Sequence, residues 1–253
     1  AGPAIAGDDD AYTEAGSSAF EKYGISDAAK ELMVGNLMRL ALFHDCCKAP
    51  LKKADIQAKV MGEHAKMRKL TNEVIAEAAS RFRDAFGYDF VELTTVRRDK
   101  KGLVTNKNAS TGLFVLVNRL DDDKDMLSWT PQSAQYGLLM VVLSLIHMCD
   151  GAIDETHLFT LLGSLGLSSR DLNHQEFGDW QALISKTFTK QYYIRRKQGE
   201  KKGTYEYVRG PRAKLEITKL QTLEFIANVF GDELDEIQRA EIADEDSDEE
   251  MED

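Results

Sequence analysis

Three side chains that bind metals in other proteins lie close together: His44, Cys46 and Cys47. A structural zinc site needs four ligands, usually in pairs with short spacing. The only other cysteine is Cys149, and no second cluster of this kind follows in the sequence. We therefore predict no metal site. Instead, we expect the adjacent cysteines to end a helix, one packed and one exposed.

The sequence carries no motif for enzymatic catalysis. It lacks the nucleophile motif G-x-S-x-G, a phosphate-binding loop and the H-E-x-x-H motif of zinc proteases. His147 stands inside an apolar run, where a hydrogen-bonded core histidine is the ordinary interpretation. We therefore predict a protein that is not an enzyme, with no catalytic residue, no cofactor and no small-molecule substrate.

The strongest chemical signal is a concentration of positive charge between residues 186 and 214. Clustered lysine and arginine side chains neutralise phosphates and so bind duplex DNA without reading its sequence. Arg212 lies in the same stretch, and a weaker set that includes Lys48, Lys52 and Lys53 lies in the first half. The predicted DNA-binding residues are Lys186, Lys190, Arg195, Arg196, Lys197, Lys201, Lys202 and Lys214.

The net charge of -11 conceals an uneven distribution. Residues 232–253 contain 13 acidic residues against Arg239, a net charge of -12, which leaves the other residues at about +1. A near-neutral body leaves room for a basic face, and the acidic end is typical of a disordered, solvated tail. An alternative is that this tail competes with DNA for the basic surface.

The element that organises the chain is the run from Gly137 to Cys149, which is apolar on nearly every side. A helix of this kind must be buried, since a helix facing water would carry a polar stripe. The run is too short to cross a membrane. We therefore predict a core helix, which Thr130 and Pro131 are placed to begin.

The elements before the central helix follow the order of a winged helix. A helix begins at Ser26 or Asp27 and ends near Cys47, a short one spans 52–61, and a third ends at Gly87. Residues 88–96 and 113–117 are rich in β-branched and aromatic residues, and a charged turn between them predicts a hairpin.

The same order repeats after the central helix. A short strand at 152–153 and a helix capped by Asp154 come first, followed by a helix capped by Asp179. A second hairpin pairs 191–197 with 204–209, and Pro211 begins a last helical stretch. The predicted fold class is mainly α with small β-hairpins (α+β), as tandem winged-helix domains. The boundaries are a flexible lead 1–27, unit A 28–120, a linker 121–132, unit B 133–231 and the acidic tail 232–253.

Several stretches resemble the MAGE (melanoma-antigen) homology domain family. They are GLLMVVLSLIHM, the triplet Phe177 to Asp179, the run from Thr204 to Gly231 with its Gly-Pro-Arg, and PLKKADI in the first half. The chain is most similar to the members that act in the SMC 5/6 complex. The resemblance implies a scaffold in chromosome maintenance and DNA repair, located on nuclear chromosomes. Its implied partners are a RING-type ubiquitin ligase subunit, a kleisin subunit and double-stranded DNA.

The resemblance also implies two partner surfaces. Many members carry a dileucine on the first helix that contacts the RING protein, and the matching pair here is Ala41-Leu42. The predicted RING-partner residues are therefore Leu40, Leu42 and Phe43. The segment entering the second hairpin departs from the family's Tyr-Leu-x-Tyr-Arg, and there the predicted kleisin-binding residues are Tyr192 and Tyr193.

Two other functions remain open at the level of sequence. One is a MAGE adaptor for a different RING ligase, and the other is a sequence-specific winged-helix transcription factor. Against the second, the third helix of unit B offers no arginine or asparagine to read base edges. Three cysteines without a secretory signal lead us to expect a reducing compartment.

Overall fold

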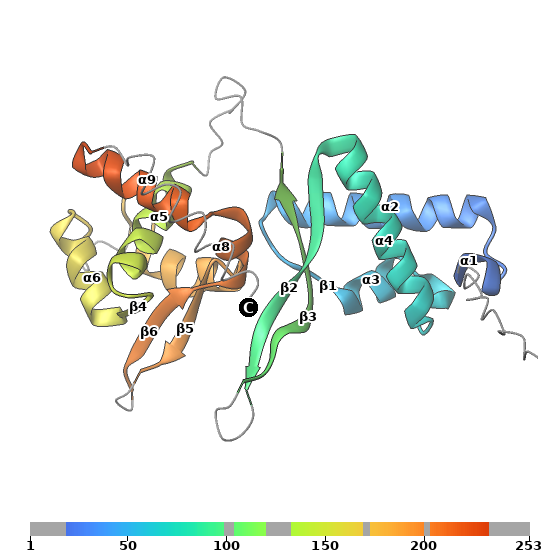
Figure 1. The fold of residues 1–253 in the computed structure, drawn as a ribbon. Coiled ribbons are helices and arrows are strands. Elements are labelled where there is room, and N and C mark those ends of the chain that lie inside the picture. Colours follow the sequence, from blue (N-terminus) through green and yellow to red (C-terminus); the bar gives the residue numbers. More distant parts are fainter. Residues whose placement is uncertain (1–18, 99–103, 120–132, 169–172, 200–202, 233–253) are drawn as a thin grey trace, which may run out of the picture.

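A computed structural model describes residues 19–98, 104–119, 133–168, 173–199 and 203–232 (Figure 1). The described residues of the first half form four helices, a 3-10 turn η1 (Gly62–His64) and three strands. They are α1 (Ala19–Lys22), α2 (Asp27–Cys46), β1 (Leu51–Lys52), α3 (Lys53–Lys59), α4 (Arg68–Phe86), β2 (Tyr88–Arg98) and β3 (Val104–Asn118).

The second half begins with α5 (Ser133–Met148) and repeats the pattern. It continues through β4 (Ala152–Asp154), α6 (Glu155–Ser164), α7 (Trp180–Ala182), the π-helical segment η3 (Leu183–Phe188), β5 (Ile194–Gln198) and β6 (Tyr205–Arg209). Two further helices, α8 (Pro211–Glu216) and α9 (Lys219–Phe230), complete the described chain.

Each half folds its three strands into one small antiparallel sheet with the same order. The first sheet is β1-β3-β2 and the second is β4-β6-β5. In both halves the first strand follows a long helix and the hairpin follows the third helix, which is the winged-helix arrangement. The predicted fold class is confirmed. Below, unit A means residues 28–120, unit B means residues 133–231, and each hairpin is called a wing.

Local sequence signals fix where the helices begin and end. The Ser26 hydroxyl accepts from the Ala29 amide at the start of α2, and Asp179 does the same for Ala182 at α7. Thr218 and Gln221 form a reciprocal capping box at α9. Gly87 ends α4 in the left-handed conformation that glycine adopts without steric cost.

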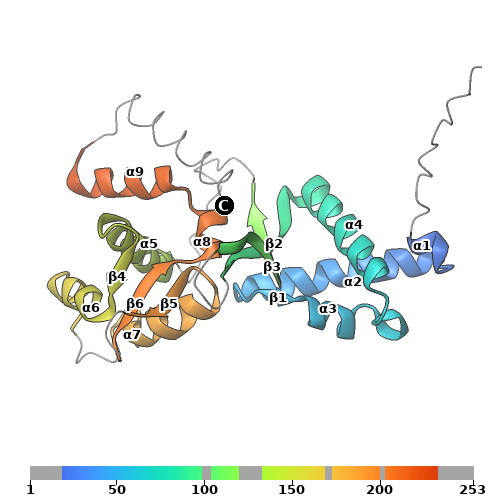
Figure 2. The ribbon, with the colours of Figure 1, turned by 60° about the horizontal axis from the view of Figure 1, so that its bottom comes forward.

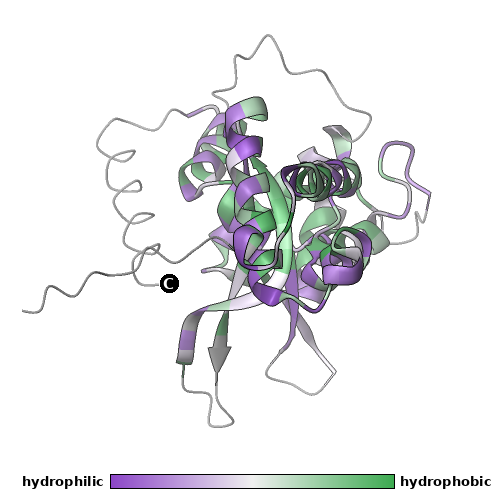
Figure 3. Ribbon diagram, turned by 90° about the vertical axis from the view of Figure 1, so that its right-hand side faces the viewer, coloured by the Kyte–Doolittle hydropathy of each residue, from purple (hydrophilic) through white to green (hydrophobic). Residues whose placement is uncertain are grey.

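Among the described residues, each half has its own core, a large cluster of buried apolar side chains. One joins α2 and α4 to the first sheet, and the other surrounds α5. The prediction that the apolar run forms a core helix is confirmed, because Leu139, Val142 and Ile146 are at most 1% exposed. In Figure 3 helices carry both green and purple residues, as expected where one face packs inward.

Several predicted boundaries need correction. Phe20, Tyr23 and Ile25 pack against the core of unit A, so the lead does not extend to residue 27. The first hairpin is longer than its apolar pattern indicated, because polar residues continue the backbone pairing out to Arg98 and Val104. Asp154 occupies the cap position of α6 without a side-chain cap bond. Thr130 and Pro131 lie outside the described residues.

None of the helices in the described ranges is long and apolar enough to span a lipid bilayer.

We predict that Leu143→Ala in α5 lowers the free energy of unfolding by about 2 to 5 kcal/mol. Leu143 is 3% exposed, so its truncation loses buried apolar surface and leaves a cavity. Urea denaturation measures the change, with Met148→Ala, a site 56% exposed, as the control. A loss below about 1 kcal/mol for Leu143→Ala would contradict the core role of α5.

Candidate partner and nucleic-acid interfaces

The two units meet across the outer face of the first sheet. Leu93, Val115 and Val117 are buried there in a third apolar cluster, against which Tyr192 and Leu215 of unit B pack. Helix α8 lies next to β2 and β3, as Figures 1 and 2 show from two directions. The first sheet is therefore covered on one face by the helices of unit A and on the other by unit B.

A buried arginine joins the units beside this apolar cluster. The guanidinium of Arg212, 1% exposed, donates to the Lys48 carbonyl and lies 3.3 Å from Asp45 Oδ1 in unit A. Within unit B its Nε donates to Glu216 Oε1 at 2.7 Å, and the charge lies 5.0 Å from the Tyr193 ring centroid. One side chain thus satisfies acceptors from both units.

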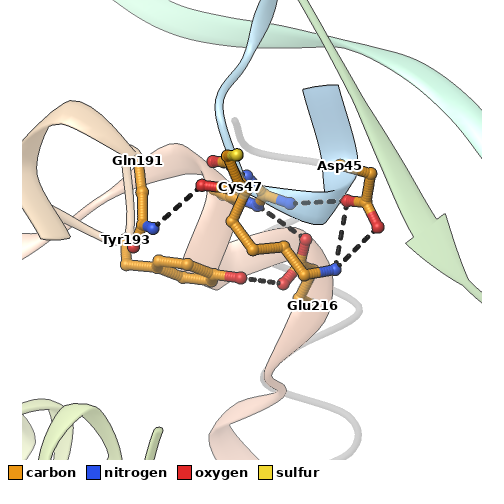
Figure 4. Close-up of polar contacts among 7 residues, drawn as sticks. Asp45, Cys47, Gln191, Tyr193 and Glu216 are labelled. Carbon is orange, nitrogen blue, oxygen red and sulfur yellow. Dashed lines mark hydrogen bonds and ion pairs between the residues drawn. The ribbon is translucent and has the colours of Figure 1, made fainter. Parts of the chain in front are cut away.

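Figure 4 shows the other polar contacts of this junction. Tyr193 donates its hydroxyl to Glu216 Oε2 at 2.6 Å, and Lys48 donates to Asp45. Gln191 Nε2 donates to the Cys47 carbonyl at 3.3 Å. The end of α2 and the two residues after it are therefore bound by the segment that precedes β5 and by α8.

Burial and neighbouring charges together set the pKa values at the junction. Burial raises the pKa of the Tyr193 phenol, and the neighbouring Glu216 carboxylate raises it further. Burial by itself would lower the pKa of Arg212, but its interactions with Tyr193, Glu216 and Asp45 outweigh that cost and raise it. Arg212 is charged and paired here, which leaves no surface for a phosphate contact.

The predicted RING-partner residues lie on α2, one turn before the junction. Phe43 is 71% exposed, whereas Leu40 and Leu42 are half-buried against the unit A core. Leu32, 61% exposed, precedes Phe43 by eleven residues, so it falls on the same side of the helix. Leu32 was not among the predicted residues, although its spacing from Phe43, about three helical turns, was a usable signal.

The two predicted kleisin-binding tyrosines have different environments. Tyr193 is 2% exposed and its hydroxyl is bonded to Glu216. Tyr192 is half-buried and lines a groove between the units. Tyr192 therefore has the more accessible surface of the pair.

The predicted DNA-binding cations do not share one environment. Lys186 and Lys190 are exposed around the end of the third helix of unit B, and Lys197 and Lys214 are exposed on β5 and α8. Arg195 is half-buried and donates to Thr95 on the other wing at 3.3 Å. Lys201 and Lys202 lie outside the described residues.

Arg196 is held within unit B. Its Nη2 lies 2.9 Å from both carboxylate oxygens of Glu155, and its charge stacks 3.5 Å above the Tyr205 ring. Tyr207 donates to the same carboxylate at 2.7 Å. Arg196 thus fixes the second wing against α6, and a DNA contact would have to compete with these bonds.

The cysteines at the end of α2 are both exposed, so the expectation that one is packed was wrong. No group of three or more His, Cys, Asp or Glu side chains within the described ranges is placed to hold a metal ion.

Comparison with known proteins identifies the family. A model of the MAGE homology domain matches residues 37–220, more than half of the chain. The chain belongs to the MAGE homology domain family.

Its relatives include proteins named for chromosome maintenance. The MAGE chain is 33% identical over 208 residues to the human "Non-structural maintenance of chromosomes element 3 homolog", covering 79% of this chain and 62% of that one. The mouse homolog is 34% identical over 205 residues, and the match covers 79% of this chain and 67% of that protein. The chain thus spans about two thirds of these relatives or less.

A solved structure shares the fold of this MAGE chain. A chain of an "Nse1-Nse3-Nse4 complex" superposes with a TM-score of 0.70 and 26% identity, over 88% of this chain and 98% of that one. At this coverage, the likeness includes residues of both units.

The junction supplies a physical reason for the Gly-Pro-Arg motif of this MAGE chain. A side chain at Gly210 would place its Cβ 2.2 Å from the Tyr192 carbonyl oxygen, which requires glycine. Pro211 is the first residue of α8, where no amide donor is needed. Arg212 then points into the junction, so the motif positions unit B on unit A.

We predict that Arg212→Ala lowers the free energy of unfolding by about 3 to 5 kcal/mol, because Asp45 and Glu216 lose their buried partner. Arg212→Lys should recover only part of the lost stability, since a lysine ammonium lacks the planar set of donors that lets the guanidinium bind acceptors of both units at once. Urea denaturation measures both, with Lys214→Ala on the exposed side of α8 as the control. Equal stability of Arg212→Ala and the parent would contradict the role of the junction.

Proposed function

We propose that this chain is a non-enzymatic scaffold subunit of an SMC 5/6-like complex that maintains and repairs nuclear chromosomes. The observation that carries the proposal is the superposition, over both units, on a chain of the Nse1-Nse3-Nse4 complex. The two similar chromosome-maintenance relatives support the same assignment. The scaffold binds a RING-type ubiquitin ligase subunit through unit A and a kleisin subunit through unit B, and it contacts double-stranded DNA.

Purification of the tagged chain from nuclear extract tests this assignment directly. Co-purification of SMC proteins together with a RING-type subunit is the expected result. Recovery of a RING ligase without SMC proteins would instead favour a MAGE adaptor for another ligase. DNA binding that survives an excess of random duplex would favour a sequence-specific transcription factor.

The proposed RING-partner surface centres on Phe43. A phenylalanine exposed this far is a candidate anchor for an interface, because burying its ring in a partner removes a large apolar area from water. Leu40 and Leu42 form the edge of that surface while packing inward. For the kleisin, the proposed contact is the accessible side of Tyr192. The adjacent Tyr193 is buried and helps to hold this segment in place.

We predict that Leu42→Glu with Phe43→Glu abolishes binding of the RING-type subunit, since charged groups replace apolar contacts. The measurement is co-expression followed by size-exclusion chromatography, with circular dichroism to show that the variant is folded. Met148→Glu, an exposed apolar site in unit B, is the control. A folded double variant that binds like the parent would exclude this surface.

The proposed DNA contact uses the exposed lysines of unit B. Among the described residues, Lys186 and Lys190 form no ion pair with a carboxylate, in contrast to Arg196 with Glu155. Each phosphate contact releases counterions and contributes a slope of about -0.9 in log K against log salt. DNA binding of this kind is steeply salt dependent and indifferent to sequence.

We predict that Lys186→Glu with Lys190→Glu weakens binding to a random duplex and reduces the magnitude of the salt slope by about 1.8. Fluorescence anisotropy across a salt titration measures both effects. The matched control is Lys66→Glu with Lys69→Glu, two exposed lysines in unit A. An unchanged slope in a folded Lys186/Lys190 variant would remove these two residues from the interface.

A further inference from the structure

A groove of about 330 Å³ opens where the two units meet. Its lining combines apolar and cationic side chains and contains no acidic residue. Unit A contributes Pro50, Lys52 and Leu113, and unit B contributes Thr189, Lys190 and Tyr192. A lining of this composition suits an extended segment that carries both carboxylates and apolar side chains.

The positive charges of the groove come from both units. Lys52 and Lys190 are exposed, and neither forms an ion pair with another described residue. Two ammonium groups that line one groove repel each other, and an anion between them removes that repulsion. The groove is thus complementary in charge to an acidic ligand.

The chain itself contains a segment of this chemistry. Residues 233–253 carry 12 acidic residues and a single basic residue, Arg239. Ile242 and Met251 place apolar side chains among the carboxylates. The segment also has a high local concentration at the groove because it is part of the same chain, and linkage within one chain gives effective concentrations on the order of millimolar.

The length of α9 determines which of the residues that follow it can reach the groove. Helix α8 lies at the junction, and α9 runs from there away from unit A (Figures 1 and 2). The 12 residues of α9 span about 18 Å, which an extended chain covers in about six residues. Residues after about 240 therefore have the reach to return to the junction.

We propose that the acidic segment Glu241–Asp253 docks in the groove of its own chain. Its carboxylates lie against Lys52 and Lys190, and an apolar side chain packs on Tyr192. Individual surface ion pairs are weak, so the docking depends on several of them and is lost as salt is raised. The docked segment covers Lys190 and Tyr192, and, resting on the proposed function, it competes there with DNA and with the kleisin.

Nuclear magnetic resonance of the 253-residue chain, without DNA or partners, tests the docking. In the parent protein the amide resonances of Glu241–Asp253 are expected to shift away from those of the isolated 13-residue peptide. Lys52→Glu with Lys190→Glu should return them to the peptide positions, as should about 0.5 M salt. The control Lys66→Glu with Lys69→Glu should leave the shifted resonances in place.

Zero-length carbodiimide crosslinking of the parent gives a second, independent reading. Amide crosslinks from this segment should form with Lys52 and Lys190 in preference to Lys66 and Lys69. The proposal is overturned if the resonances of the parent already match the free peptide, or if the crosslinks are spread evenly over the four lysines. Because neither experiment contains DNA or a partner subunit, a failure of the docking is distinguishable from a failure of the scaffold function.

Discussion

The buried guanidinium of Arg212 is the interaction on which the relative placement of the two units depends. A charge that is 1% exposed is tolerated only where acceptors surround it, and here Lys48, Asp45 and Glu216 provide them. Two of these acceptors belong to unit A and one to unit B. Separating the units would leave the charge or its acceptors without partners, so the polar contact adds to the apolar cluster beside it.

Because this contact joins the two units, it also fixes how the two proposed partner surfaces lie relative to each other. The end of α2 carries Phe43 on its outer side and Asp45 at the junction, less than one turn apart. On the other side, Tyr192 lines the groove while the adjacent Tyr193 lies under Arg212. A ligand at either proposed surface would therefore contact a segment that also holds the units together.

Positive charge serves two purposes in this molecule. Arg196 and Arg212 are arginines engaged with carboxylates, and the planar guanidinium suits such pairing at partly or fully buried positions. Lys186 and Lys190 are exposed lysines on the same unit and retain their hydration. The difference follows from side-chain chemistry. Within one basic stretch of sequence, Arg196 and Arg212 have structural contacts, whereas Lys186 and Lys190 remain exposed at the surface.

The sequence by itself determined the elements and the fold class. The apolar period of α4, the apolar run of α5 and the caps at Ser26 and Asp179 are local signals, and local signals decide where helices begin and end. The repeated order of helices and hairpins then left the tandem winged helix as the arrangement that buries both apolar sets. The polar extension of the first hairpin and the π-helical segment η3 carried no such pattern, and they were missed.

Only the tertiary structure decided which residues of the candidate surfaces are accessible. Tyr192 and Tyr193 are adjacent and alike in sequence, yet packing of α8 buries one and leaves the other beside a groove. Arg212 stands among lysines in a basic stretch, and its partners Asp45 and Lys48 are more than 160 residues away. Contacts at that separation arise when two units pack together, and no local period or composition records them.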